Sequence, residues 1–123
     1  MDKRVLLIED EPSIIEAIRF ILTRDGWSVQ SHSEGATATA RVREAKPDVV
    51  ILDVMLPGKS GFDILDELRA DPELAELPVL LLTARGQQQD RERAERAGAS
   101  LYMTKPFSNS EVLASVKALV QRL

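Results

Sequence analysis

The feature that most constrains the fold of this chain is an apolar run that ends in a carboxylate. Residues 49–52 read Val-Val-Ile-Leu, Asp53 follows at once, and Pro57-Gly58 then predicts a turn. A run this apolar and rich in β-branched residues is typical of a strand buried on both faces of a sheet. A charge at the end of a buried strand must be solvated or paired, so a lone aspartate here would simply begin a loop.

Three further strand-like runs also end in polar side chains, and they change this interpretation. Residues 5–8 lead into Glu9 and Asp10, residues 79–82 into Thr83, and residues 101–103 into Thr104 and Lys105. The carboxyl ends of parallel strands lie at one edge of a sheet. We therefore expect acids, a hydroxyl and an ammonium group to converge on Asp53.

Length, charge and cysteine content argue against several classes of protein. The 123 residues, 44% of them hydrophobic, predict a single domain spanning 1–123 with a substantial core. The net charge of −4 argues against direct nucleic-acid binding by this domain. The absence of cysteine and the single histidine, His32, argue against a disulfide or a zinc site. The first apolar run is too short for a signal sequence or a membrane span, which predicts a cytoplasmic protein without membrane contact.

The order of the expected elements predicts the fold class. Strands are expected at about 4–8, 27–31, 48–53, 79–83 and 100–103, and helices at about 12–25, 35–45, 62–70, 87–97 and 109–122, the third with its exit at Asp71-Pro72 and the last with a Ser108–Glu111 capping box. This alternation predicts an α/β fold, a doubly wound five-stranded parallel sheet with right-handed crossovers. The most apolar strands should lie centrally, and the order 2-1-3-4-5 satisfies this placement and opens a crevice between Asp10 and Asp53. The polar helix 87–97 has only Ala94 and Ala97 to bury and should be the least firmly anchored.

The residues expected in the crevice suit phosphoryl transfer. Glu9, Asp10 and Asp53 would form an acidic cluster that needs a compensating cation. With oxygen ligands alone, that cation is expected to be Mg²⁺ or Mn²⁺. Lys105 adds a second positive charge and Thr83 a hydroxyl donor. Asp53 would then act as the nucleophile and form an acyl phosphate, with catalysis arising from positioning and charge stabilisation.

Six short motifs follow one another along the chain. They are Glu9-Asp10, the apolar strand ending in Asp53, residues 55–61 (Met-Leu-Pro-Gly-Lys-Ser-Gly), residues 83–86 (Thr-Ala-Arg-Gly), Gly98-Ala99, and residues 102–107 (Tyr-Met-Thr-Lys-Pro-Phe). In this order and spacing the motifs resemble a response regulator receiver domain of two-component systems, and the resemblance covers nearly the whole chain. Residues 55–58 and 83–86 are similar to the branch joined to winged-helix DNA-binding domains. The resemblance implies a flavodoxin-like fold and phosphorelay signal transduction.

The resemblance also implies a role for each site residue. Asp53 would accept a phosphoryl group from a histidine kinase or a phosphotransfer protein. Glu9, Asp10, Asp53 and the backbone carbonyl of Met55 would hold Mg²⁺, while Thr83 and Lys105 would bind the phosphoryl group, with a cis Lys105–Pro106 bond. Such a domain is a phosphoacceptor switch that promotes its own phosphoryl transfer and dephosphorylation, rather than an enzyme with an external substrate.

The switch and the dimer are further implications of the resemblance. Tyr102, by itself an ordinary half-buried strand aromatic, would turn inward when Thr83 moves toward the phosphate, and the fourth helix, fifth strand and fifth helix would control an output partner or domain. Receivers of this branch dimerise through that face by ion pairs. Arg91 and Glu111 retain one pair, but this chain has Ala97, Ser100 and Leu101 where acids are usual, Ser115 where a basic residue is usual, and Arg122 without its partner. We expect a monomer without phosphate and at most a weak phosphorylation-dependent homodimer.

Other readings of the same fold fit the residues less well. A phosphatase of the haloacid dehalogenase type needs a second aspartate where Met55 stands. An FMN binder would place a phosphate against Glu9-Asp10-Glu11, and the glycine-lysine motif of a P-loop is absent. The alternative that stays open is a phosphate-independent interaction module on the same fold.

Overall fold

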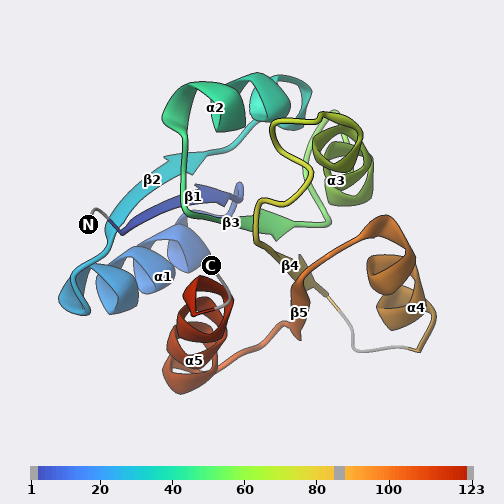
Figure 1. Ribbon diagram of the computed structural model, residues 1–123. Helices are drawn as coiled ribbons and strands as arrows, with labels where there is room; N and C mark the ends of the chain where they lie inside the picture. The colour runs from blue at the N-terminus through green and yellow to red at the C-terminus, as the bar shows by residue number, and fades with distance from the viewer. Residues whose placement is uncertain (1–2, 85–87, 122–123) are drawn as a thin grey trace.

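Five parallel strands form one sheet in the computed structural model, which describes residues 3–84 and 88–121. The strands lie in the order β2-β1-β3-β4-β5, as the sequence predicts (Figure 1). Their bounds are Arg4–Ile8 for β1, Ser28–His32 for β2, Val49–Asp53 for β3, Val79–Thr83 for β4 and Leu101–Thr104 for β5. Every residue of β3 and β4 is buried, whereas the edge strands β2 and β5 are mixed. The hydrophobicity of each run therefore decided its place in the sheet.

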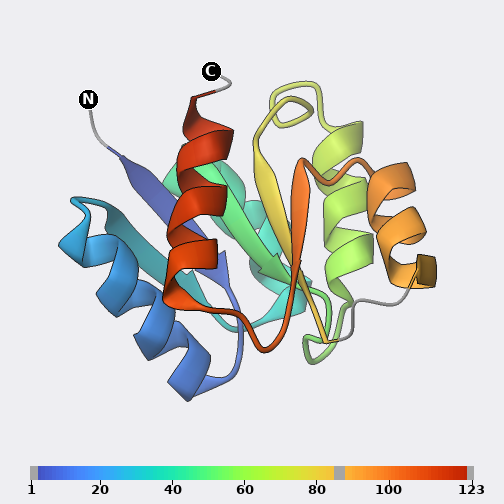
Figure 2. The same cartoon turned by 90° about the horizontal axis from the view of Figure 1, so that it is seen from below.

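Helices cover both faces of the sheet, so each strand contributes to two apolar cores. Figures 1 and 2 show α1 and α5 on one face and α2, α3 and α4 on the other. The helices are α1 (Pro12–Arg24), α2 (Ala38–Ala45), α3 (Gly61–Ala70), α4 (Gln88–Ala97) and α5 (Asn109–Val120). Along β1, Val5 and Leu7 pack toward α1 and α5, while Leu6 and Ile8 pack toward α2 and α3. None of the described helices is both long and apolar enough to cross a membrane.

The structure corrects several of the expected element bounds. The second strand begins at Ser28 rather than at Trp27, because the Trp27 amide donates to Leu22 O and the indole packs into the core beside α1. Gly35–Thr37 forms a short 3-10 turn, η1, before α2 begins. The fifth strand begins at Leu101, one residue later than expected. Ser100, just before it, bonds Val79 twice: its amide donates to Val79 O, and its hydroxyl oxygen accepts from the Val79 amide.

Two further expectations concern α4 and α5. Ala94 is the only buried side chain among those the structure describes in α4, which agrees with a weakly anchored helix. Residue 87, its expected start, lies outside the described residues. The α5 capping box is confirmed: Ser108 Oγ accepts from the Glu111 amide, and the Glu111 carboxylate accepts from the Ser108 amide, both at 3.1 Å.

Candidate functional site

The three acids predicted from the strand ends do come together. Glu9 follows β1 directly and is fully buried, Asp53 ends β3 and is 1% exposed, and Asp10 is exposed at the rim. One carboxylate oxygen of each lies within 4.8 Å of the other two. The parallel pairing of β1 with β3 is what aligns these ends, from Val5 beside Val49 to Ile8 beside Leu52.

Lys105 reaches the same point from the end of β5. Its Nζ lies 3.0 Å from Glu9 Oε1 and 3.3 Å from Asp53 Oδ1. A longer contact of 3.8 Å joins it to Glu11 Oε1, an acid that was not among the predicted site residues. The position of Glu11 just after the Glu9-Asp10 pair was the only available signal. One ammonium thus faces three carboxylates.

Backbone amides orient two of the carboxylates. Glu9 Oε2 accepts hydrogen bonds from the amides of Asp10 at 3.0 Å and Glu11 at 3.1 Å. The Met55 amide donates to Asp53 Oδ1 over 3.3 Å. In the described part of the chain, Asp53 Oδ2 is buried and has no hydrogen-bond partner. A buried carboxylate oxygen without a partner is costly, so it marks a position for a positively charged ligand.

The titration of Asp53 reflects the same excess of negative charge. Burial and then the neighbouring Glu9 charge raise the pKa of its carboxyl to about 6, and the opposing charge of Lys105 does not offset them. Burial alone would lower the pKa of Lys105, but the hydrogen bond to Glu9 and the charge of Asp53 outweigh it and raise that pKa. The ammonium is therefore firmly charged, yet it does not neutralise the cluster.

The donor set fits a hard divalent cation. Carboxylate oxygens, with no nitrogen or sulfur ligand among the three clustered residues, are the ligands that Mg²⁺ and Mn²⁺ prefer. The unpartnered Asp53 Oδ2 and the exposed Asp10 leave room for such an ion and its water molecules. Because its other oxygen already accepts two amides, Glu9 could offer the ion only Oε1.

Thr83 and Tyr102, the expected switch pair, lie on neighbouring strands. Thr83 ends β4 and is 2% exposed, and its hydroxyl donates to Met103 O over 3.5 Å. Tyr102 is half-buried against the core on the α2–α4 face. Its hydroxyl accepts from Nε of Arg91 on α4, whose guanidinium lies 5.3 Å from the ring centroid. No pattern in the sequence predicts this Arg91–Tyr102 contact.

Two further expectations concern the peptide bond before Pro106 and the ion pair of the expected dimer. The Lys105–Pro106 bond is cis, as the resemblance implied. Both members of the expected cross-subunit pair have partners within the chain: Arg91 bonds Tyr102, and Glu111 closes the α5 capping box. Arg122 lies outside the described residues.

Comparison with known proteins consistently finds response regulators. The family model "Response regulator receiver domain" matches residues 5–117. The "Probable transcriptional regulatory protein TcrX" of Mycobacterium tuberculosis is 45% identical over 118 residues, which are 96% of this chain and 50% of that protein. The chain thus spans about half the length of the curated relatives it matches.

Two solved structures extend the likeness to the fold. A response regulator from Chloroflexus aurantiacus has a TM-score of 0.94 at 30% identity, covering 99% of this chain and 100% of that one. The receiver domain of sensor histidine kinase PA1611 from Pseudomonas aeruginosa, crystallised with a magnesium ion in its active-site cleft, has a TM-score of 0.89 at 28% identity, covering 98% and 99%. With its acidic edge, its strand order and these relatives, the chain belongs to the response regulator receiver domain family of two-component systems.

Proposed function

We propose that Asp53 accepts a phosphoryl group from the phosphohistidine of a histidine kinase or a phosphotransfer protein. The observation that carries this proposal is the buried Asp53 carboxylate, which has one oxygen without a hydrogen-bond partner in the described part of the chain and lies beside Lys105 and two further acids. A carboxylate placed this way is a nucleophile whose attack is compensated by nearby positive charge.

The transfer forms one bond and breaks one. A carboxylate oxygen of Asp53 attacks the phosphorus, the new P–O bond forms an acyl phosphate, and the P–N bond to the donor imidazole breaks. The imidazole leaves with the electron pair and takes up a proton from solvent. Lys105 bonds a phosphoryl oxygen in place of its present contact with Asp53 Oδ1, and the Thr83 hydroxyl bonds another.

A divalent cation would supply the remaining charge stabilisation. Glu9, Asp10, Asp53 and the Met55 carbonyl are the residues proposed to hold Mg²⁺, which when bound shields the approaching phosphoryl oxygens from the carboxylates. Glu9 keeps Lys105 in place through the 3.0 Å ion pair, and the two backbone amides on its other oxygen fix its orientation.

The donor would approach over the cleft beside the site. Glu11, Ser13, Ile14, Ala17, Lys105, Pro106 and Phe107 line a surface cleft between the start of α1 and the loop after β5. Ile14 and Phe107 are partly buried apolar side chains at this mouth. Such a rim, next to the nucleophile, suits docking of a helical partner that presents its histidine.

The proposed output signal begins at Thr83 and Tyr102, on the neighbouring strands β4 and β5. We infer that phosphorylation draws Thr83 toward the phosphoryl group, lets Tyr102 turn inward, and changes the face formed by α4, β5 and α5. Relatives are named as transcriptional regulatory proteins about twice as long as this chain, which supports control of a DNA-binding output domain or partner. The net charge of −4 supports a role for this domain without nucleic-acid contact of its own.

Intact-mass spectrometry after incubation with acetyl phosphate and Mg²⁺ tests the assignment. The wild-type chain should gain one phosphoryl group and Asp53→Asn none. Asp66→Asn, which removes an exposed carboxylate on α3, is the matched control and should label like the wild type. Equal labelling of Asp53→Asn would move the acceptor elsewhere, and no labelling of the wild type would favour the phosphate-independent interaction module.

A further inference from the structure

The loop between β3 and α3, residues 54–60, lies directly after the phosphoacceptor and is held closely at its far end. The Gly61 amide donates to Val54 O over 2.9 Å, and a Cβ on Gly61 would lie 2.3 Å from Asp53 O. Ser60 Oγ caps α3 by accepting from the amides of Phe62 and Asp63. The loop thus folds back onto the strand end, and this brings the Met55 amide to Asp53 Oδ1.

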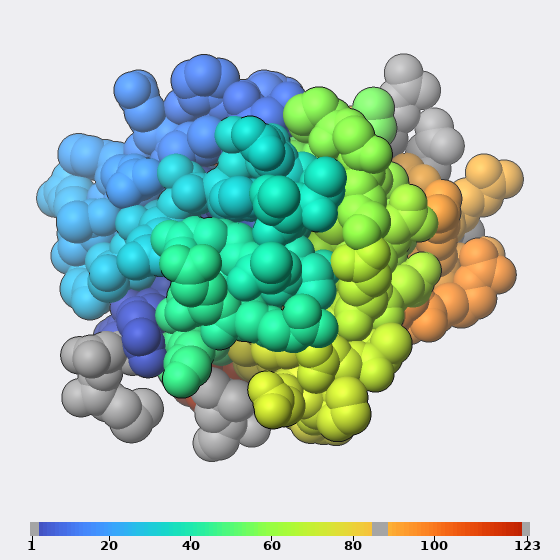
Figure 3. Space-filling view, turned by 90° about the horizontal axis from the view of Figure 1, so that it is seen from above, coloured from blue at the N-terminus to red at the C-terminus, as the bar shows by residue number. Residues whose placement is uncertain are grey.

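Lys59, the second-to-last residue of this loop, ties it to two helices. Its Nζ pairs with Glu67 Oε2 on α3, and the other oxygen of Glu67 accepts from Thr39 Oγ1 on α2 at 2.5 Å. Figure 3 shows α2 and α3 side by side on this face of the molecule. The Lys59 backbone is also in contact, because a Cβ on buried Gly35 would lie 2.6 Å from Lys59 O.

We propose that Lys59, Glu67 and Thr39 are positioning residues for the phosphoacceptor site. By anchoring the loop to α2 and α3, they keep the Met55 amide on Asp53 and hold the Met55 carbonyl available as a cation ligand. This inference rests on the proposed function, since it concerns the proposed Mg²⁺ site. The three residues touch neither the metal cluster nor the phosphoryl group, and they act through the backbone of the loop.

A simple surface ion pair would not carry such a role. The Lys59 and Glu67 side chains are 29% and 40% exposed, and an isolated pair of that kind contributes little. Here the pair belongs to a chain of three side chains, supported by the backbone contact with Gly35. The hydrogen bonds from Lys59 and then from Thr39 lower the pKa of the Glu67 carboxyl, so it stays charged at neutral pH.

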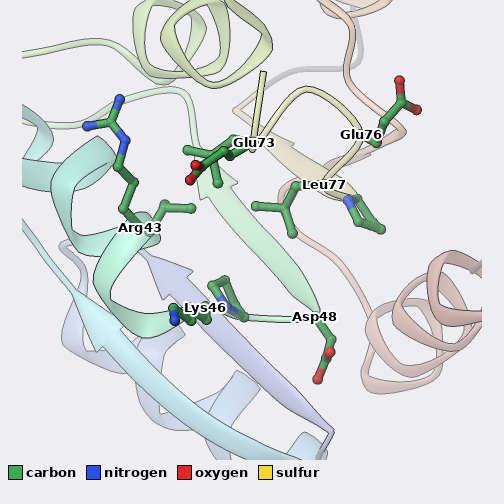
Figure 4. A pocket seen from close by; sticks show the side chains of 10 residues that line it. Arg43, Lys46, Asp48, Glu73, Glu76 and Leu77 are labelled. Atoms are coloured by element: carbon green, nitrogen blue, oxygen red, sulfur yellow. The ribbon is translucent and has the colours of Figure 1, made fainter. Parts of the chain in front are cut away.

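A second bridge between the same helices supplies the matched control. Arg43 on α2 donates to Asp71 Oδ2, at the end of α3, from Nε over 2.8 Å and from Nη2 over 2.6 Å. Figure 4 shows Arg43 beside a surface groove that residues 46–48, 73–74 and 76–78 also line, and Arg43 lies one turn along α2 from Thr39. This bridge joins α2 to α3 without touching the loop that follows Asp53.

The sign of the effect separates positioning from simple electrostatics. If Lys59 acted only through its charge, Lys59→Met would remove a repelling cation and tighten Mg²⁺ binding, whereas Glu67→Gln would weaken it. If the two residues position the loop, both substitutions weaken Mg²⁺ binding. Thr39→Val removes a hydroxyl without changing charge and should also weaken it.

Calorimetric titration of the unphosphorylated chain with Mg²⁺ tests the proposal. Substitution of outer partners at metal sites commonly costs about tenfold or more in affinity, so we expect losses of about three- to tenfold in Lys59→Met, Glu67→Gln and Thr39→Val. Lys59→Arg, which keeps the donor, and Arg43→Met should stay near the wild type. Thermal unfolding of each variant shows that it is folded, and Thr39→Val carries the test should Lys59→Met not fold.

Each other outcome overturns the inference. Tighter binding in Lys59→Met with weaker binding in Glu67→Gln would indicate a through-space charge effect. Equal weakening in Arg43→Met would indicate general loss of α2–α3 packing. Wild-type affinity in Thr39→Val and Lys59→Met would leave the loop independent of these residues, while a wild-type chain that binds no Mg²⁺ would refute the metal site proposed above as well.

Discussion

Lys105 Nζ lies 3.3 Å from Asp53 Oδ1, yet the pKa of Asp53 is raised to about 6. A single ammonium lowers a carboxyl pKa, but here burial and the Glu9 charge act in the opposite direction and prevail. The same Nζ also pairs with Glu9 Oε1 at 3.0 Å, so one ammonium charge is shared by two buried carboxylates. The site therefore holds an excess of negative charge that costs folding free energy when no cation is bound.

The first prediction concerns the pH dependence of stability without Mg²⁺. A carboxyl with a raised folded-state pKa binds its proton more tightly when folded, so its stabilising contribution is complete below the unfolded value of 3.8 and is lost as the pH rises through about 6. Asp53→Asn should therefore be more stable than the wild type at pH 8, by about 1–3 kcal/mol, and the gap should close near pH 4. Urea unfolding at both values measures it, and a gap independent of pH would contradict the raised pKa.

The second prediction concerns the cation. Asp10 is the exposed member of the acidic cluster, so Asp10→Asn should weaken Mg²⁺ binding by removing a charge from its ligands while changing the fold little. Calorimetric titration should show a loss of about tenfold or more. Unchanged affinity in this variant would place the ion away from the cluster.

The third prediction concerns the conformational switch. A beryllofluoride mimic of the phosphoryl group should change amide exchange in α4 and β5 more than in α5, because α4 is thinly packed and its Arg91 bonds the Tyr102 hydroxyl. In Tyr102→Phe, which deletes the hydroxyl that Arg91 bonds, exchange in α4 should already be faster without the mimic. A response confined to residues 53–60 would refute the coupling from Thr83 to Tyr102.

The fourth prediction concerns assembly. Arg91 and Glu111 each have a partner within the chain, so a cross-subunit pair must first displace the bonds to Tyr102 and Ser108. We expect a monomer without phosphate and a weak dimer with beryllofluoride, which Arg91→Gln weakens further, by about two- to fivefold. Sedimentation velocity over a micromolar concentration series checks this. A tight dimer that survives high salt would show that apolar contacts around Ala97 and Leu101 hold the interface instead.

The fifth prediction concerns Arg69, a half-buried arginine on α3. Its guanidinium donates to the carbonyls of Leu74, Ala75, Leu77 and Gly98 at 2.7–3.3 Å, and to Ser100 Oγ at 3.4 Å. Burial lowers its pKa, but the group stays protonated. Arg69→Met would leave these acceptors without a donor and should cost about 2–4 kcal/mol by urea unfolding, with Arg69→Lys intermediate. A cost no larger than that of Arg43→Met would refute this structural role.

The fold and the identity of the acidic cluster were predictable from the sequence because both depend on local patterns. The apolar runs at 49–52 and 79–82 specify buried strands wherever they lie, and alternation with helices specifies a parallel sheet. In a parallel sheet the residues after each strand share one edge, so the meeting of Glu9, Asp53 and Lys105 follows from their positions in the sequence. Two of the bounds that failed depend on particular hydrogen bonds: the Trp27 amide bonds Leu22 O at the end of α1, and Ser100 bonds Val79 on the neighbouring strand.

Contacts between side chains distant in sequence were decided only by the tertiary structure. Examples are the contact of Arg91 with Tyr102 and the contacts of Glu67 with Lys59 and Thr39. These contacts depend on how closely neighbouring helices and loops pack, and no residue pattern encodes that distance. The pKa of Asp53 was likewise decided by the tertiary structure. The sequence determined which charges meet, but the depth of burial and the sharing of Lys105 arise from packing of the whole domain, and these decide how strongly the carboxylate requires a cation.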